Sequence, residues 1–125
     1  MTPVERACLA GAPHHTPEEP LEDCLVAAFV TQVVALGTGV STHEIAAATR
    51  AQFKASQARQ ITMYLIHVAC GWSLRRVAAA FGRDRSTAAH ACQRVEDMRD
   101  DPAIEALLIT CEACVRAAPR PGMAA

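Results

Sequence analysis

Apolar side chains recur every three or four residues along much of this chain, and glycine or proline separates the segments that carry them. This spacing is typical of helices that turn one face away from solvent. The first such segment spans residues 21–36, and Gly37 ends it. Its stripe consists of Leu21, Leu25, Ala28, Phe29, Gln32, Val33 and Leu36. The uninterrupted apolar run at 24–30 is predicted to be a buried helical segment.

Short polar signals predict where the next helices begin and end. Ser41 and Glu44 form a capping box, which predicts a short helix that runs to about Thr49. Residues 50–57 show no period and are interpreted as a loop. The following helix, at about 57–70, is expected to end at Gly71 and to bury four side chains. These are Ile61, Tyr64, Leu65 and Val68.

Three further helices are predicted in the second half of the chain. A helix of about two turns begins near Leu74 and ends at Gly82, and a longer one spans about 85–99 with Asp84 as its N-cap. Asp101 and Pro102 give the start signal of a last helix. Its apolar side contains Ile104, Leu107, Leu108, Cys111 and Val115.

These segments predict an all-α fold of about six helices without strands. Residues 1–20 are rich in proline and are interpreted as a flexible arm, residues 21–118 as one helical domain, and residues 119–125 as a flexible tail. Half of the residues are apolar but only 4% are aromatic, which favours close-packed helices over a sheet. No uninterrupted apolar run approaches the roughly 18 residues that span a bilayer, and no secretory signal is evident. A cytoplasmic protein that does not contact a membrane is therefore expected.

Catalytic and metal chemistry find little support in the sequence. The six cysteines are expected to be buried, reduced thiols, because most of them fall within apolar helical stripes. Cys111 and Cys114 form the single CxxC, and no second pair completes the four ligands of a structural zinc site. No nucleophile–base pair or carboxylate pair stands out. We expect no enzyme activity, no metal and no cofactor.

The distribution of charge is more informative than the net charge of −1. Residues 1–49 carry six acidic side chains and one basic one, and residues 95–125 carry six acidic and three basic ones. Residues 50–94 carry eight basic side chains and a single acidic one. A basic middle between acidic flanks is what a nucleic-acid-binding surface requires, and an ordinary solvated face would show the same charges.

The two helices predicted on either side of Gly82 have the form of a helix-turn-helix. The second helix has an apolar stripe of Ala88, Ala91, Cys92, Val95 and Met98. Its other side contains Ser86, Ala89, His90, Gln93 and Asp97, with Arg85 and Arg94 beside them. Small residues there allow the helix to approach a groove floor, and an α-helix fits the major groove of B-DNA.

Four blocks in order resemble the C-terminal DNA-binding domain of the bacterial chromosomal replication initiator DnaA, which has a Trp-repressor-like fold. They are RQITMYL at 59–65, SL at 73–74, FGRDRST at 81–87 and HACQRVE at 90–96. The resemblance covers roughly residues 22–110. It implies that the partner is double-stranded DNA. The residues that it implies as DNA contacts, together with neighbouring basic ones, are Arg59, Gln60, Ser73, Leu74, Arg75, Arg83, Asp84, Arg85, Ser86, Thr87, His90 and Arg94.

The chain also departs from the family pattern. Arg85 stands where the family has histidine, and a guanidinium can grip guanine in a bidentate way that imidazole cannot. His67 stands where the family has lysine, Arg75 replaces a proline, and one glycine of the turn is missing. The family inserts an arginine from a basic loop into the minor groove. Arg50 and Lys54 are the nearest candidates for this contact, and neither aligns cleanly.

The sequence contains no GxxxxGK[ST] motif, so no nucleotide is expected to bind. The resemblance therefore predicts a free-standing, nucleoid-associated domain that prefers a DNA sequence, as a transcriptional regulator or as a competitor at DnaA-type boxes. The alternative is a protein-interaction module that kept the fold and lost DNA binding. The helix at 21–36 could bind another protein or a second copy in either case.

Overall fold

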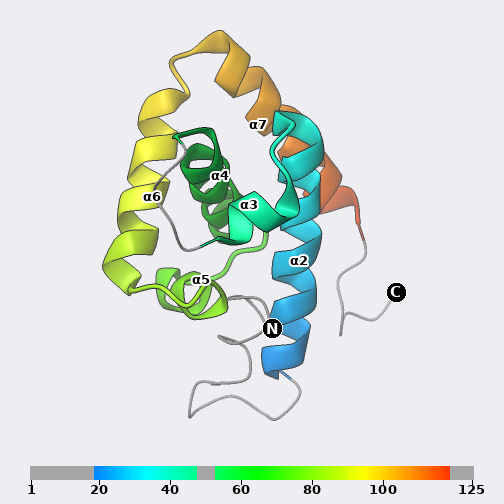
Figure 1. The fold of residues 1–125 in the computed structure, drawn as a ribbon. Helices are drawn as coiled ribbons and strands as arrows, with labels where there is room; N and C mark the ends of the chain where they lie inside the picture. The colour runs from blue at the N-terminus through cyan, green and yellow to red at the C-terminus, as the bar shows by residue number, and fades with distance from the viewer. Residues whose placement is uncertain (1–18, 48–52, 119–125) are drawn as a thin grey trace.

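In the computed structural model, the described residues are 19–47 and 53–118, and they form six helices with no strand among them (Figure 1). The helices are α2 (Glu19–Thr38), α3 (Thr42–Ala46), α4 (Phe53–Ala69), α5 (Leu74–Ala80), α6 (Arg85–Met98) and α7 (Pro102–Ala117). The predicted all-α fold is thus confirmed. Apart from Glu19 and Pro20, which belong to α2, the predicted arm at 1–20 and the tail at 119–125 lie outside the described residues.

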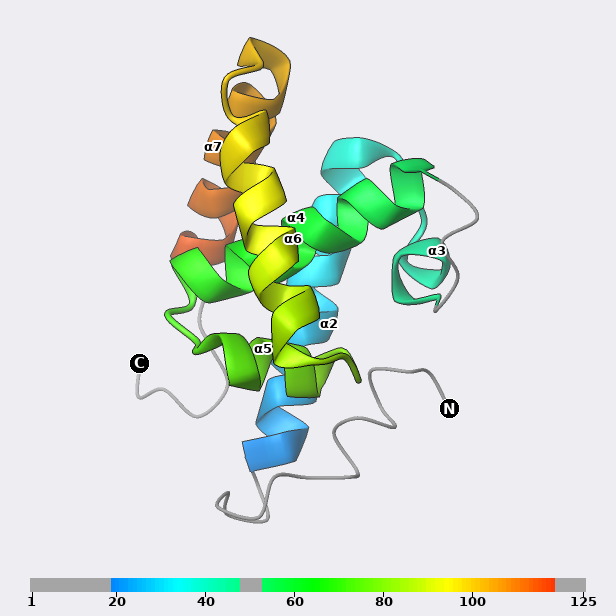
Figure 2. The ribbon, with the colours of Figure 1, turned by 90° about the vertical axis from the view of Figure 1, so that its left-hand side faces the viewer.

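Helix α4 lies at the centre of the molecule and packs against each of the other five helices. In Figures 1 and 2, α6 covers one side of α4 and α2 the other. Because α4 is enclosed, the six consecutive residues 61–66 are all buried, a pattern expected of a helix that is covered all round. Ile61, Tyr64 and Leu65 are buried as predicted. The prediction for Val68 is wrong, since its side chain is 37% exposed near the C-terminal end of α4.

The helix boundaries follow the polar signals closely in most places. The Oγ of Ser41 accepts a hydrogen bond from the N–H of Glu44 at 3.1 Å, and the Oδ1 of Asp101 accepts one from Ala103 at 2.9 Å. Two boundaries differ from the prediction. Helix α3 ends at Ala46, short of Thr49, and α4 begins at Phe53 within the segment interpreted as a loop. The buried face of α4 begins with the small residues Ala55 and Ala58, before the first large apolar residue of that face, Ile61.

Helix α2 turns the predicted stripe outward, which corrects the prediction of a buried run at 24–30. Its buried face contains Asp23, Val26, Ala27, Val30, Thr31 and Val34, whereas Leu25, Ala28 and Phe29 are exposed. The C-terminal end of α2 lies close to α7, because a Cβ added at Gly37 would come within 2.8 Å of the Cδ1 of Leu107. Two opposite stripes of α2 are therefore apolar, and only one of them is covered.

Helix α2 also changes the expectation that no segment could span a bilayer. The 18 residues Leu21–Thr38 have a mean hydropathy of 1.5, so by length and composition alone this helix is long and apolar enough to cross a membrane. Of these residues, 33% are buried inside the fold. The core helix of a folded domain can meet the same criterion of length and hydropathy. The expectation of buried, reduced thiols is confirmed for Cys92 and Cys111. Cys70 and Cys114 are also free, but Cys70 is only partly buried and Cys114 is exposed. The expectation is wrong for Cys24, which is disulfide-bonded.

Candidate nucleic-acid interface

The connection between α5 and α6 is a tight turn that depends on Gly82. This residue has a φ of +63°, in the left-handed region that glycine adopts without strain. The N–H of Gly82 donates to the carbonyl of Ala79 at 3.2 Å, and the N–H of Arg83 donates to that of Ala78 at 2.9 Å. These two bonds form a Schellman motif, which satisfies the last carbonyls of α5 and reverses the chain direction. Only four residues, 81–84, therefore separate α5 from α6.

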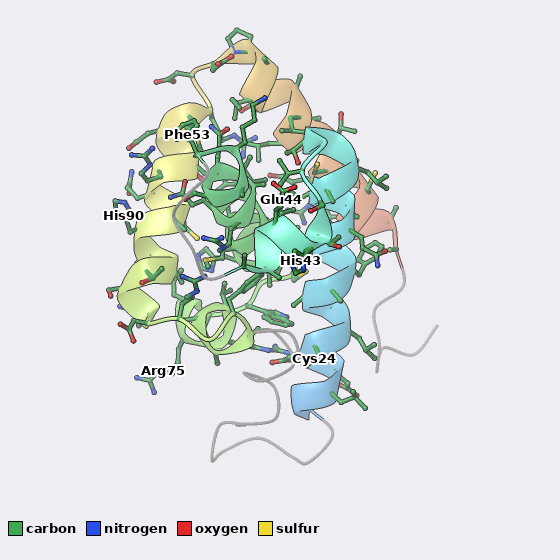
Figure 3. The ribbon with its side chains drawn as sticks, in the orientation of Figure 1. Cys24, His43, Glu44, Phe53, Arg75 and His90 are labelled. Atoms are coloured by element: carbon green, nitrogen blue, oxygen red, sulfur yellow. The ribbon has the colours of Figure 1, made fainter. Side chains whose placement is uncertain are left out.

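Helix α6 has two sharply different faces, as its sequence predicts. Ala88, Ala91, Cys92 and Val95 are buried against the other helices, and Met98 is partly buried. The opposite face exposes Ser86, His90, Gln93, Arg94 and Asp97, and the first turn adds Arg85 and Thr87. Figure 3 shows His90 pointing away from the body of the molecule. A polar, exposed stripe on a helix that is firmly packed behind it has the form required of a groove-reading element.

Asp84 occupies the N-cap of α6 through its backbone alone. Its carbonyl accepts from the N–H of Thr87 at 3.0 Å and from that of Ala88 at 3.2 Å. The predicted capping by its side chain is wrong, because the carboxylate makes no capping hydrogen bond and is exposed. The N–H groups of the first turn are consequently left without this acceptor, at the electropositive end of the helix.

The start of α5 contributes three of the predicted contact residues. Ser73 caps this helix, with its Oγ accepting from the N–H of Arg76 at 3.1 Å. Leu74 is partly buried and packs against the core. Arg75 is exposed and points away from α5 into solvent (Figure 3).

Arg76 has a structural position that the sequence does not reveal. Its guanidinium forms a bidentate ion pair with Asp23 of α2, with Nη2–Oδ1 at 2.7 Å and Nε–Oδ2 at 3.1 Å. The same group lies 4.0 Å over the ring centroid of Trp72, which is buried. His67 supports this corner as well, because its Nδ1 donates to the carbonyl of Trp72 at 2.7 Å. These contacts hold α5, and with it the base of the turn, against α2 and α4.

Arg59 is buried, in contrast to the exposed residues of α6. It is only 6% exposed, and it donates from Nε to the carbonyl of Ile45 at 2.8 Å and from Nη2 to the carbonyl of Ala47 at 2.5 Å. Burial and the neighbouring Arg83 lower the pKa of its guanidinium from the ordinary value. Arg83 reaches the same Ala47 carbonyl at 3.4 Å. Arg59 therefore ties the end of α3 to α4.

The other basic and amide residues predicted near this surface differ in exposure. Gln60 is half-buried beside Arg59, whereas Lys54 is exposed in the first turn of α4. Arg50 lies outside the described residues. Most of the exposed predicted residues thus lie on α5, the turn and α6, which pack against each other, whereas Lys54 lies at the start of α4 and Arg59 is buried.

A polar network fixes the far end of α6, which the sequence analysis did not foresee. The hydroxyl of Tyr64 donates to Glu96 at 2.6 Å and accepts from Arg99 at 2.8 Å. Arg99 also donates two hydrogen bonds to the carboxylate of Glu105 in α7, at 2.6 and 2.8 Å. Helices α4, α6 and α7 are joined at this point. The sequence contains the Tyr64 hydroxyl and its charged partners, but it does not show that the fold brings them together.

Among residues 19–47 and 53–118, no group of three or more His, Cys, Asp or Glu side chains could hold a metal ion. Every buried side-chain nitrogen or oxygen in the same ranges has a hydrogen-bond partner. Within the described residues, the polar feature that stands out is the exposed face of α6.

Comparison with known proteins agrees with this geometry. A family model described as "Bacterial dnaA protein helix-turn-helix" matches residues 27–95, which is more than half of the chain. A solved structure titled "Crystal structure of DNA replication initiation factor" is similar with a TM-score of 0.69 and 27% sequence identity. The similarity covers 79% of this chain and 30% of that one, so this chain spans less than a third of the length of that protein. No curated protein matches the chain.

Proposed function

Because this chain belongs to the family of bacterial DnaA helix-turn-helix domains, which bind double-stranded DNA, we propose that it recognises a preferred DNA sequence with α6 in the major groove. The family is a DNA-binding one and is not catalytic. The observation that carries the proposal is the first half of α6, where Arg85, Ser86, Thr87 and His90 are all exposed on a helix whose other face is buried.

The proposed base contacts come from the first two turns of α6. Arg85 has the geometry to donate two hydrogen bonds to the O6 and N7 of guanine, the most common specific contact in the major groove. The Asp84 carboxylate, which caps nothing, can accept from the N4 amino group of cytosine. Ser86, Thr87 and His90 supply shorter donors and acceptors to neighbouring bases or phosphates.

The proposed phosphate contacts come from basic residues on α4, α5, α6 and the turn. Arg75 and Arg94 are exposed on α5 and α6, and Lys54 is exposed on α4. The backbone around Ser73 and Leu74 can approach the DNA strand at the start of α5, and Arg83 is half-exposed at the turn. If about five phosphates are neutralised, log affinity falls with log salt with a slope of roughly −4 to −5.

Arg59 and Gln60 have a supporting role in this proposal. The Arg59 guanidinium already serves two carbonyls and is almost fully buried, so we assign it to positioning residues 45–47 next to the interface. A minor-groove contact by Arg50 stays a prediction from the family resemblance. No nucleotide or metal enters the proposed function.

The biological role that fits this binding is a transcriptional regulator or a competitor at DnaA-type boxes, in the cytoplasm and on the nucleoid. Titration of the protein against labelled duplexes, one with a DnaA-type box and one scrambled, tests the proposal. We expect tighter binding to one defined sequence. Equal affinity for all duplexes, or no binding in low salt, would contradict it.

Two arginine variants make this test sharper. Arg85→Ala should change which base is preferred at one position, because the guanidinium reads a base edge. Arg116→Ala is the matched control, since Arg116 is exposed in the last turn of α7, far along the chain from the proposed interface. It should leave both affinity and preference unchanged.

An interaction module without DNA binding is the second candidate, and the exposed stripe of α2 is the observation that favours it. A stable assembly in solution that neither binds duplexes nor changes when they are added would support this alternative over the first.

A further inference from the structure

Helix α2 exposes an apolar stripe that no other helix of the described residues covers. The stripe, called here the outer stripe, contains Leu21, Leu25, Ala28, Phe29, Gln32 and Leu36. At 100° per residue these six positions fall within about 100° of one another, and they lie opposite the buried face of α2. Leu21, Leu25, Phe29 and Leu36 are 64, 51, 39 and 88% exposed. An exposed apolar row of this size on a folded domain usually marks a surface that a partner covers.

We propose that a second copy of this chain covers the outer stripe, with the two α2 helices packed antiparallel. The positions of the stripe are symmetric about the point between Ala28 and Phe29, because the intervals in either direction from that point are three and then four residues. When a two-fold axis passes through this point, each Leu21 lies opposite Leu36 of the second copy, and each Leu25 lies opposite Gln32. Such a patch is complementary to itself, as an isologous dimer interface requires.

The residues at the centre of the stripe suit close packing in this arrangement. The two-fold axis brings the two Phe29 rings together on one side and the two Ala28 methyl groups on the other. Aromatic pairs of this kind add to the gain from burial, and alanine lets helix backbones approach. Gln32 is the one polar member, and a single polar residue in an apolar helix seam is a known means of fixing register.

The charge of the stripe favours a second copy over a nucleic acid or a membrane surface. None of its six members is charged, and α2 contains no lysine or arginine anywhere along Glu19–Thr38. Helices that lie on anionic membranes carry these residues on their polar face. An uncharged stripe can instead meet its own copy without repulsion between like charges.

The area of the stripe is consistent with a weak dimer. Covering its exposed side chains would remove on the order of 500 Å² per copy, so about 1,000 Å² in total, near the lower limit of specific interfaces. We therefore expect a dissociation constant on the order of 1–100 µM. Helix α4 separates α2 from α6, so both recognition helices stay uncovered in the dimer (Figure 2).

Sedimentation equilibrium of the full chain between about 1 and 300 µM tests the proposal. The molecular mass should rise from that of a monomer to that of a dimer, and Leu36→Glu should weaken the dimer at least tenfold. Phe53→Glu is the matched control, because Phe53 is 69% exposed on α4, outside the stripe, and this variant should dimerise as the natural chain does. Circular dichroism should show the same helix content in all three proteins.

Three outcomes would overturn the proposal. The first is a monomer mass at every concentration, whether or not the protein binds vesicles of phosphatidylglycerol and phosphatidylethanolamine. The second is an equal effect of Leu36→Glu and Phe53→Glu. The third is a dimer that disappears in Cys114→Ser, because Cys114 is an exposed free thiol and such a dimer would be held by a disulfide.

The antiparallel register has a test of its own. Leu25→Glu should weaken the dimer, and adding Gln32→Lys on the same chain should restore most of the lost affinity, because the two positions face each other only between copies. Within one helix they are two turns apart, about 10 Å, and do not pair. A double variant that dimerises no better than Leu25→Glu would refute the antiparallel arrangement.

Discussion

The buried Arg59 allows a direct test of whether a residue that the family resemblance predicts to contact DNA acts instead as a structural clamp. In Arg59→Met the apolar volume of the side chain is largely kept, but the carbonyls of Ile45 and Ala47 lose their donors. A hydrogen bond to a charged group contributes about 1.5–3 kcal/mol, and an unsatisfied buried carbonyl costs about 1–3 kcal/mol.

The expected loss is smaller than the sum of these terms. Removing the guanidinium also removes the cost of burying it, which is the larger cause of its lowered pKa, and Arg83 stays within 3.4 Å of the Ala47 carbonyl. We therefore expect Arg59→Met to lower the free energy of unfolding by about 2–4 kcal/mol. That is a large part of the roughly 5–15 kcal/mol available to a domain.

Urea unfolding followed by circular dichroism measures this loss, with Arg75→Met as the control. Arg75 is exposed and without a structural contact to lose, so its substitution should change the free energy of unfolding by less than about 0.5 kcal/mol. DNA titration at several salt concentrations gives the second measurement. A clamp leaves the slope of log affinity against log salt unchanged in Arg59→Met, whereas loss of a direct phosphate contact reduces it by about 1. Unaltered stability together with a reduced slope would refute the clamp.

Three further predictions concern the frame around the interface. Tyr64→Phe removes the hydroxyl shared by Glu96 and Arg99, so it should lower the free energy of unfolding by about 1–3 kcal/mol in urea; a change within error would mean that the network does not stabilise the fold. Gly82→Ala forces a Cβ into a left-handed turn and should cost about 1–2 kcal/mol by thermal unfolding, and an unchanged melting temperature would contradict this. Burial raises the pKa of the Cys92 thiol to about 11, so at pH 8 only about one in a thousand of these thiols is ionised. A thiol reagent should modify the exposed Cys114 at once and Cys92 only after unfolding, and rapid labelling of Cys92 in the folded protein would show the reasoning to be wrong.

The sequence predicted the helices, and it predicted the two faces of α6 residue by residue. It succeeded there because charged and apolar positions alternate with a clear helical period between Arg85 and Met98. In α2 the same approach failed, because apolar residues surround the helix and periodicity cannot decide which side is covered. That choice depends on how α4 and α7 meet α2, which is a matter of tertiary packing.

The role of Arg59 could not be predicted for a related reason. A motif identifies a position, but it does not say whether a neighbouring segment will bury it, and here the end of α3 does so. The Asp84 side chain shows the converse case. Its place at the N-cap follows from the sequence, but the rotamer that would complete the cap is not adopted.

The separation of the two faces of α6 makes this domain a convenient scaffold for engineering. Ser86, His90 and Arg94 contribute nothing to the hydrophobic core, and Gln93 bonds only to Asp97 on the same helix. A library randomised at these four positions should therefore consist mostly of folded members, because surface substitutions of this kind usually change stability by less than about 0.5 kcal/mol. If the proposed readout by α6 is correct, selection from such a library should yield variants that bind different DNA sequences on the same framework.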